Sequence, residues 1–147
     1  MMNYVLIVHL LAATIWTGGH LILAFAILPK ILATKDVAGL LDFEQTFEKV
    51  GMPALLLQIA TGLWMSYKML PSVGAWFSHD NDISILITTK LILLSLTLLI
   101  ALHARFRVIP TLSKRSLNFF ALHIFAITII GVSFVIVGSL FRTGLGG

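Results

Sequence analysis

Histidine side chains recur inside the apolar stretches of this sequence, where a polar ring needs a partner. Four of the five histidines lie in such stretches, namely His9, His20, His103 and His123. Imidazole is a good ligand for copper, zinc, iron and nickel, and neutral histidine is the usual axial ligand of haem iron. The function therefore depends on whether the fold brings these rings to a common place.

The composition indicates an integral membrane protein. Of the 147 residues, 59% are hydrophobic and 11% are charged, whereas a soluble domain carries about 25% charged residues. The formal charge of +4 does not favour nucleic acid as a partner, because the basic residues lie between apolar segments. The absence of cysteine excludes disulfides and thiolate metal sites.

Four segments are long enough to cross a bilayer, which takes about 20 apolar residues in a helix. We place these spans at about residues 4–28, 50–69, 83–104 and 117–141. A proline follows each of the first three spans: Pro29 directly after the first, Pro71 two residues after the second, and Pro110 after the third. The sequence thus predicts an all-α fold, with residues 1–147 forming one transmembrane four-helix bundle in contact with lipid.

The charge distribution predicts the orientation. On the side opposite the termini, the basic residues are Lys30, Lys35, Lys49, Arg105, Arg107, Lys114 and Arg115. The terminal side has Lys68 and Arg142, and Lys90 falls inside the third span. The excess of Lys and Arg is typical of the cytoplasmic side. We therefore expect both termini on the outer side of the inner membrane, which is the periplasmic side if the source is a Gram-negative bacterium.

Residues 36–49 form an amphipathic segment before the second span. Val37, Leu40 and Phe47 fall on one helical face, opposite Asp42 and Lys49. This pattern predicts a helix that either lies along the cytoplasmic surface or extends the second span.

Three spans deliver an imidazole to the cytoplasmic half of the bundle. His20 is about 12 Å from the end of its span, His103 is within about one turn of the end, and His123 is about six residues inside. Their depths agree to within about 10 Å. We expect a metal centre at His20, His103 and His123.

A second group belongs to the outer half. His9 lies eleven residues before His20, close to three helical turns, so the two share a face of the first span. Its expected neighbours are Met65 and Met69 from the second span and Lys90 from the third. His9, Met65 and Met69 would form an outer relay for the same metal.

Three interpretations of the histidines follow. In the first, they hold a copper ion, and the chain is not an enzyme. In the second, His20 with His103 or His123 binds haem b, Arg105 and Arg107 pair with its propionates, and the chain passes electrons between a quinol and an acceptor. In the third, the histidines only join helices by hydrogen bonds. A homodimer would help such a thin bundle to cover a cofactor.

The residues resemble a known family along nearly the whole chain. The matching stretches are His9 to Pro29, Phe43-Glu44, Phe47-Glu48, Gly51 to Leu55, Thr61 to Trp64, Lys90-Leu91, Leu102 to Arg105, Ile109-Pro110, Ala121 to Ile124 and Phe141 to Gly144. They are similar to short membrane proteins of the copper-resistance D (CopD) family. This resemblance implies copper transport or tolerance at the inner membrane, with a periplasmic copper carrier as a partner.

Two weaker resemblances point to haem chemistry. The four-helix layout is similar to bacterial b-type di-haem membrane cytochromes. A fainter likeness to HemJ-type protoporphyrinogen oxidases rests on His9, Trp16, Gly19 and Lys90 in matching order. Copper is thus the leading expectation for the cofactor, and haem b is the alternative.

Overall fold

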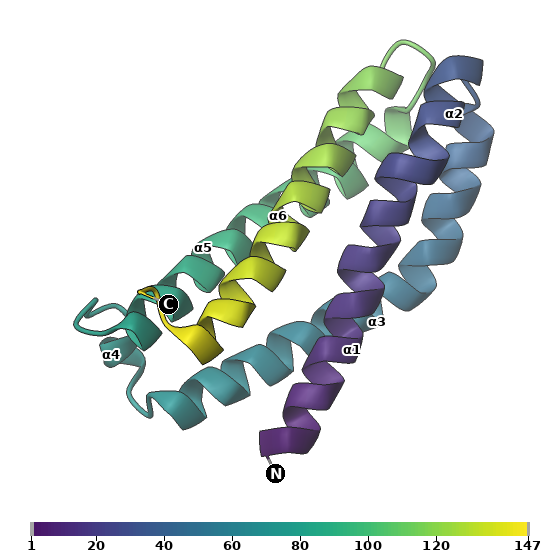
Figure 1. The fold of residues 1–147 in the computed structure, drawn as a ribbon. Coiled ribbons are helices and arrows are strands. Elements are labelled where there is room, and N and C mark those ends of the chain that lie inside the picture. Colours follow the sequence, from purple (N-terminus) through teal and green to yellow (C-terminus); the bar gives the residue numbers. More distant parts are fainter. Residues whose placement is uncertain (1, 147) are drawn as a thin grey trace.

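The computed structural model describes residues 2–146, which are helical with short connections (Figure 1). In chain order the elements are α1 (Met2–Ile22), η1 (Leu23–Ile27), α2 (Leu28–Thr34), α3 (Val37–Met69), α4 (Val73–Trp76), α5 (Asp82–His103), η2 (Ala104–Val108), η3 (Ile109–Thr111) and α6 (Leu117–Thr143). The all-α prediction is confirmed for this part of the chain.

These elements join into four helical segments long enough and apolar enough to cross a membrane, as expected. They are Asn3–Thr34, Val37–Met69, Asp82–Thr111 and Leu117–Thr143. The start of α1 and the end of α6 lie toward the same end of the bundle, here called the terminal end (Figure 1). The opposite end, which holds the α2–α3 turn and the loop before α6, is called the loop end.

The first and third spans are longer than predicted. We expected them to end before Pro29 and Pro110, but both helices continue past these prolines. A five-residue π-helical segment precedes each proline: η1 before Pro29 and η2 before Pro110. Proline lacks the N–H that would bond the carbonyl four residues earlier. In the two π segments the backbone bonds span five residues, from the Leu28 N–H to the Leu23 carbonyl and from the Ile109 N–H to the Ala104 carbonyl, so the helix is wider just before each proline. The first span therefore reaches Thr34 and the third reaches Thr111.

A tight turn joins the first two spans. Lys35 adopts the left-handed conformation with φ of 57°, and the Asp36 carboxylate accepts a hydrogen bond from the Gly39 N–H at 2.9 Å. This N-cap satisfies an otherwise free donor at the start of α3. Residues 37–49 are thus continuous with α3, so the amphipathic segment extends the second span.

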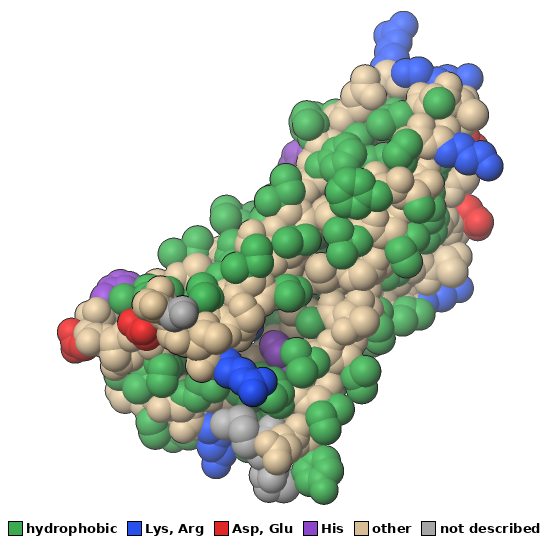
Figure 2. Space-filling model, in the orientation of Figure 1, with side chains coloured by type: hydrophobic (Ala, Val, Ile, Leu, Met, Phe, Trp, Pro, Cys, Tyr) green, Lys and Arg blue, Asp and Glu red, His purple; other side chains and the backbone are tan. Residues whose placement is uncertain are grey.

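Packing is concentrated toward the loop end. One cluster of buried apolar residues joins η1, α2, α3, η2 and α6 there, and a smaller cluster of Trp16, Leu55 and Ile127 lies farther toward the middle. Toward the terminal end, α1 and α3 separate from each other, and α3 continues toward α4 (Figure 1). Much of the outer surface is apolar (Figure 2), as contact with lipid requires.

Phe47 fixes how closely α1 and α3 approach. A Cβ atom added at Gly19 would overlap the Phe47 ring, and one added at Gly51 would lie 2.7 Å from its Cε1 atom. The ring also lies edge-on to His20 with centroids 5.4 Å apart. These two glycines make the close approach of α1 and α3 possible.

The neighbouring glycines Gly18 and Gly19 provide a matched test. We expect Gly19→Ala to destabilise the protein by about 1–3 kcal/mol, because it overpacks the Phe47 contact. Gly18→Ala meets nothing within 4 Å and should be neutral or stabilising, because alanine favours helix. Thermal unfolding followed by circular dichroism in one detergent checks both. Equal shifts for the two variants would contradict this packing.

Candidate functional site

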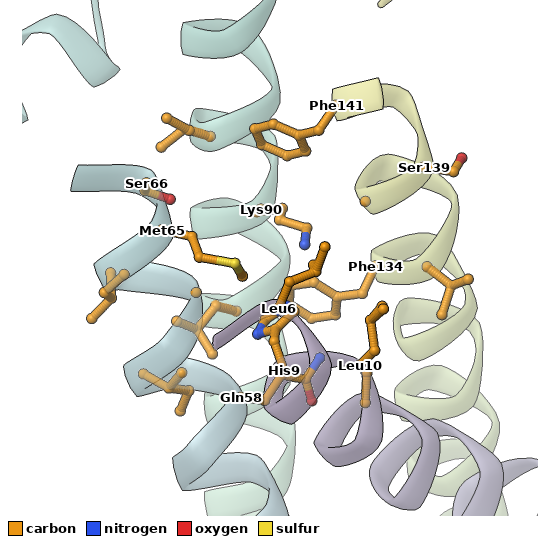
Figure 3. Close-up of a pocket in the computed structure, with 18 of the residues that line it drawn as sticks. Leu6, His9, Leu10, Gln58, Met65, Ser66, Lys90, Phe134, Ser139 and Phe141 are labelled. Carbon is orange, nitrogen blue, oxygen red and sulfur yellow. The ribbon is translucent and has the colours of Figure 1, made fainter. Parts of the chain in front are cut away.

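A cavity of about 570 Å³ lies in the terminal half between α1, α3, α5 and α6 (Figure 3). Its walls are mostly apolar. The polar or sulfur-bearing residues that line it are His9, Gln58, Met65, Ser66, Met69, Lys90, Ser139, Arg142 and Thr143. In the space-filling view, a hollow near this end contains a histidine, with a Lys or Arg side chain beside it (Figure 2). The cavity brings together groups from all four spans.

His9 is held with one ring nitrogen free. Its Nδ1 atom lies 2.8 Å from Thr61 Oγ1, and the Thr61 hydroxyl donates to the Leu57 carbonyl at 2.6 Å. Thr61 Oγ1 therefore accepts from His9 Nδ1–H, so Nε2 keeps its lone pair. Gly62 makes room for the ring, because a Cβ atom there would lie 3.2 Å from His9 Cε1. The buried ring thus offers Nε2 as a ligand atom.

Lys90 brings a cation to the same cavity. Its Nζ atom lies 5.6 Å from the centre of the Phe141 ring, and a Cβ atom added at Gly138 would lie 3.4 Å from it. In residues 2–146, the structure has one salt bridge, and it does not involve Lys90. A lysine within a span is expected to face a partner or a cavity. Lys90 meets that expectation by facing the cavity.

Gln58 adds an unused acceptor. This residue is 7% exposed, and its Oε1 atom has no hydrogen-bond partner among the described residues. A buried polar atom without a partner costs about 1–3 kcal/mol. Its position on the cavity wall means that a ligand with an O–H or N–H donor would remove this cost.

The structure brings His9, Met65, Met69 and Lys90 around the one cavity. Met65 is buried, and its sulfur lies among the labelled side chains of the close-up (Figure 3). The sequence places Gln58 on one face with Met65 and Met69, but the unpaired acceptor of Gln58 and the Thr61 contact to His9 were not predicted. Gln58, Thr61, Met65 and Met69 recur at helical spacing on α3, and this pattern was the available signal.

His103 and His123 form a second site nearer the loop end. His123 Nδ1 lies 2.9 Å from the Phe119 carbonyl and therefore carries the proton. His123 Nε2 lies 2.7 Å from His103 Nδ1, so it accepts from that nitrogen. Among the described residues, the pair thus leaves one nitrogen, His103 Nε2, without a hydrogen bond. His103 is exposed on the outside of the bundle.

His20 does not complete a three-histidine centre with this pair. Its ring is buried between Trp16 and Phe47, with centroids 4.5 and 5.4 Å away, and its Nδ1 atom donates to the Trp16 carbonyl at 2.8 Å. Within residues 2–146, no group of three or more His, Asp or Glu residues is placed to hold a metal ion. The expected centre at His20, His103 and His123 is therefore not assembled, because agreement in depth does not fix which face each helix turns inward.

The two arginines proposed for haem propionates lie near the loop end. Arg105 forms a 2.6 Å ion pair with Glu48, which links η2 to α3. Arg107 is exposed. Neither lines the cavity at the terminal end, whereas Arg142 and Lys90 do.

Four membrane-length helices with an apolar outer surface define a multi-pass membrane protein. A family model described as Copper resistance protein D (CopD) matches residues 41–141, which is more than half of the chain. The chain therefore belongs to the CopD family, a family of copper-resistance membrane proteins. No curated protein and no solved structure matches it.

The hydrogen bonds around His9 predict its tautomer. We expect neutral His9 to carry its proton on Nδ1, because Thr61 Oγ1 accepts there. Nitrogen-15 NMR of selectively labelled histidine in detergent distinguishes the two tautomers. Thr61→Val should remove the preference, whereas Thr97→Val, on another span, should not change it. A proton on Nε2 in the unmodified protein would contradict the arrangement.

Proposed function

We propose that this chain is a copper-handling protein of the inner membrane, acting in copper transport or tolerance, and that its cavity receives the ion. One observation carries the proposal: in a member of the CopD family, a free imidazole nitrogen and buried methionine sulfur line the same cavity. We thus assign the ion to His9, Met65 and Met69 in the cavity, and not to the metal centre expected from the sequence at His20, His103 and His123.

The donor atoms favour the reduced ion. Thioether sulfur is a soft ligand that selects Cu(I), and imidazole suits copper generally. The Lys90 ammonium lies in the same cavity and repels a divalent ion about twice as strongly as a monovalent one. Both effects act in the same direction, so we assign Cu(I) rather than Cu(II) to this site.

The loop end supplies a second station for the ion. His103 Nε2 has no hydrogen-bond partner in the part of the chain that the structure describes, and His123 holds the ring through its other nitrogen, as outer-shell partners of metal-bound histidines do. The excess of Lys and Arg at this end favours a cytoplasmic location for it. The cavity then faces the periplasm, where a copper carrier would deliver the ion. His20 lies between the two stations along the first span.

A haem-binding redox protein is the second candidate, and the size of the cavity favours it. Cofactor pockets measure about 300–1,000 Å³, and the cavity of about 570 Å³ falls within this range. His9 Nε2 would supply one axial ligand, and Lys90 and Arg142 would pair with propionates. Three of the four residues that resemble HemJ-type oxidases line the cavity, namely His9, Trp16 and Lys90. A porphyrinogen oxidase would therefore use the same cavity.

Ligand substitutions test the copper proposal. We expect His9→Ala and Met65→Leu each to weaken Cu(I) binding by about tenfold or more, which corresponds to about 1.4 kcal/mol or more. Met52→Leu is the matched control, because Met52 is exposed on the same helix and does not line the cavity. Anaerobic competition with a chromophoric Cu(I) chelator measures the affinities of the detergent-purified proteins.

The absorption spectrum separates the two candidates. A Soret band that survives purification and is lost in His9→Ala would support haem and count against copper. About one copper per chain without a Soret band would support the copper proposal. Equal Cu(I) affinities for His9→Ala, Met65→Leu and Met52→Leu would reject the cavity as the copper site.

A further inference from the structure

A metal ion leaves most of the cavity empty. One water molecule takes about 30 Å³ in the liquid, and an ion with its nearest ligands needs only a small part of about 570 Å³. The remaining walls are apolar and include Trp16, Phe134 and Phe141. Apolar and aromatic walls of this kind suit a flat organic ligand. The cavity therefore has room for an occupant other than the ion.

The rim of the cavity indicates where that occupant comes from. Leu6, Leu10, Leu63 and Val135 line the cavity and are also exposed on the outer surface, by 41, 54, 41 and 54% respectively. They belong to α1, α3 and α6, which are membrane-spanning helices. The apolar rim thus lies on the lipid-facing surface. An occupant that enters through it dissolves in the membrane.

Two unpaired polar groups define the head of the occupant. Gln58 Oε1 is a buried acceptor that no donor of residues 2–146 reaches. Lys90 Nζ is a donor without a carboxylate partner in the described chain. A ligand that satisfies both groups has an O–H for Gln58 and a separate oxygen acceptor for Lys90. It also has a flat ring for the aromatic walls.

We infer that the cavity binds a quinol, the reduced form of a membrane quinone. One ring hydroxyl donates to Gln58 Oε1, the other ring oxygen accepts from Lys90 Nζ, and the tail extends past the apolar rim into the lipid. This inference concerns binding and goes beyond the proposed function, because it does not depend on copper. Gln58 Oε1 can only accept a hydrogen bond, and an oxidised quinone has no hydroxyl hydrogen. The site therefore selects the reduced form.

The experiment compares the two redox forms of one probe. A short-chain benzoquinol and its oxidised form are titrated separately into the full-length protein in lipid nanodiscs, and quenching of tryptophan fluorescence reports binding. The Trp16→Phe variant identifies the part of the signal that comes from the cavity. We expect the reduced form to bind roughly tenfold more tightly, as the loss of one buried hydrogen bond implies.

Two variants assign that preference to Gln58. Gln58→Leu should remove the preference without lowering the unfolding temperature, because it deletes a buried oxygen that has no partner. Thr97→Val is the matched control: Thr97 Oγ1 is also buried and unpaired, but it does not line the cavity, so this variant should keep the full preference. Lys90→Met should weaken binding of both redox forms.

Three results would overturn the inference. The first is equal affinity of the unmodified protein for the two redox forms. The second is displacement of the probe by oleate with an affinity that Gln58→Leu does not change, which would make the cavity a space for acyl chains. The third is a co-purified haem that excludes the probe. Cu(I) titration of the same preparations is read separately, so the copper proposal can fail while quinol binding stands.

Discussion

In hydrocarbon there is no water to satisfy polar groups, so each must find its partner within the protein. This constraint explains most side-chain contacts of the spans. Thr14, Thr89 and Ser95 return their hydroxyls to the carbonyl four residues earlier, and His20 and His123 do the same with Nδ1. Gln58 Oε1 and Thr97 Oγ1 are the exceptions among the buried side-chain atoms of residues 2–146. Gln58 lines a cavity, so a bound ligand can donate the hydrogen bond that its Oε1 atom lacks.

The same constraint governs the prolines. Pro29 and Pro110 each remove one backbone donor near the loop end, and the π segments η1 and η2 lie just before them. The π turns allow the helices to continue, and η2 also carries Arg105 to Glu48 on α3. An exposed ion pair of this kind is worth about 0–1 kcal/mol. Its contribution is mainly to orientation, whereas the apolar cluster at the loop end provides the stability of that half.

Hydropathy predicted much of the fold because the length and polarity of each span can be determined from the sequence without knowledge of the tertiary structure. It also gave the depth of each histidine, and the 3.6-residue period placed His9 and His20 on the buried side of α1. It did not give the rotation of α5, which is apolar around nearly its whole circumference. His103 therefore meets His123 rather than His20. The cavity could not be predicted either, since it depends on how the helices separate toward the terminal end (Figure 1).

The charge of Lys90 determines how favourably each candidate ligand binds in that cavity. In a low-dielectric site an unpaired ammonium repels any cation, and the repulsion grows with the charge of the ion. A divalent metal is therefore the poorest occupant, and Cu(I) becomes favourable when an anion or a neutral oxygen ligand accompanies it. A quinol oxygen offers a neutral acceptor, and haem propionates offer full negative charges. The chemistry of this site thus follows from the basic side chains at its wall, Lys90 and Arg142, as much as from His9.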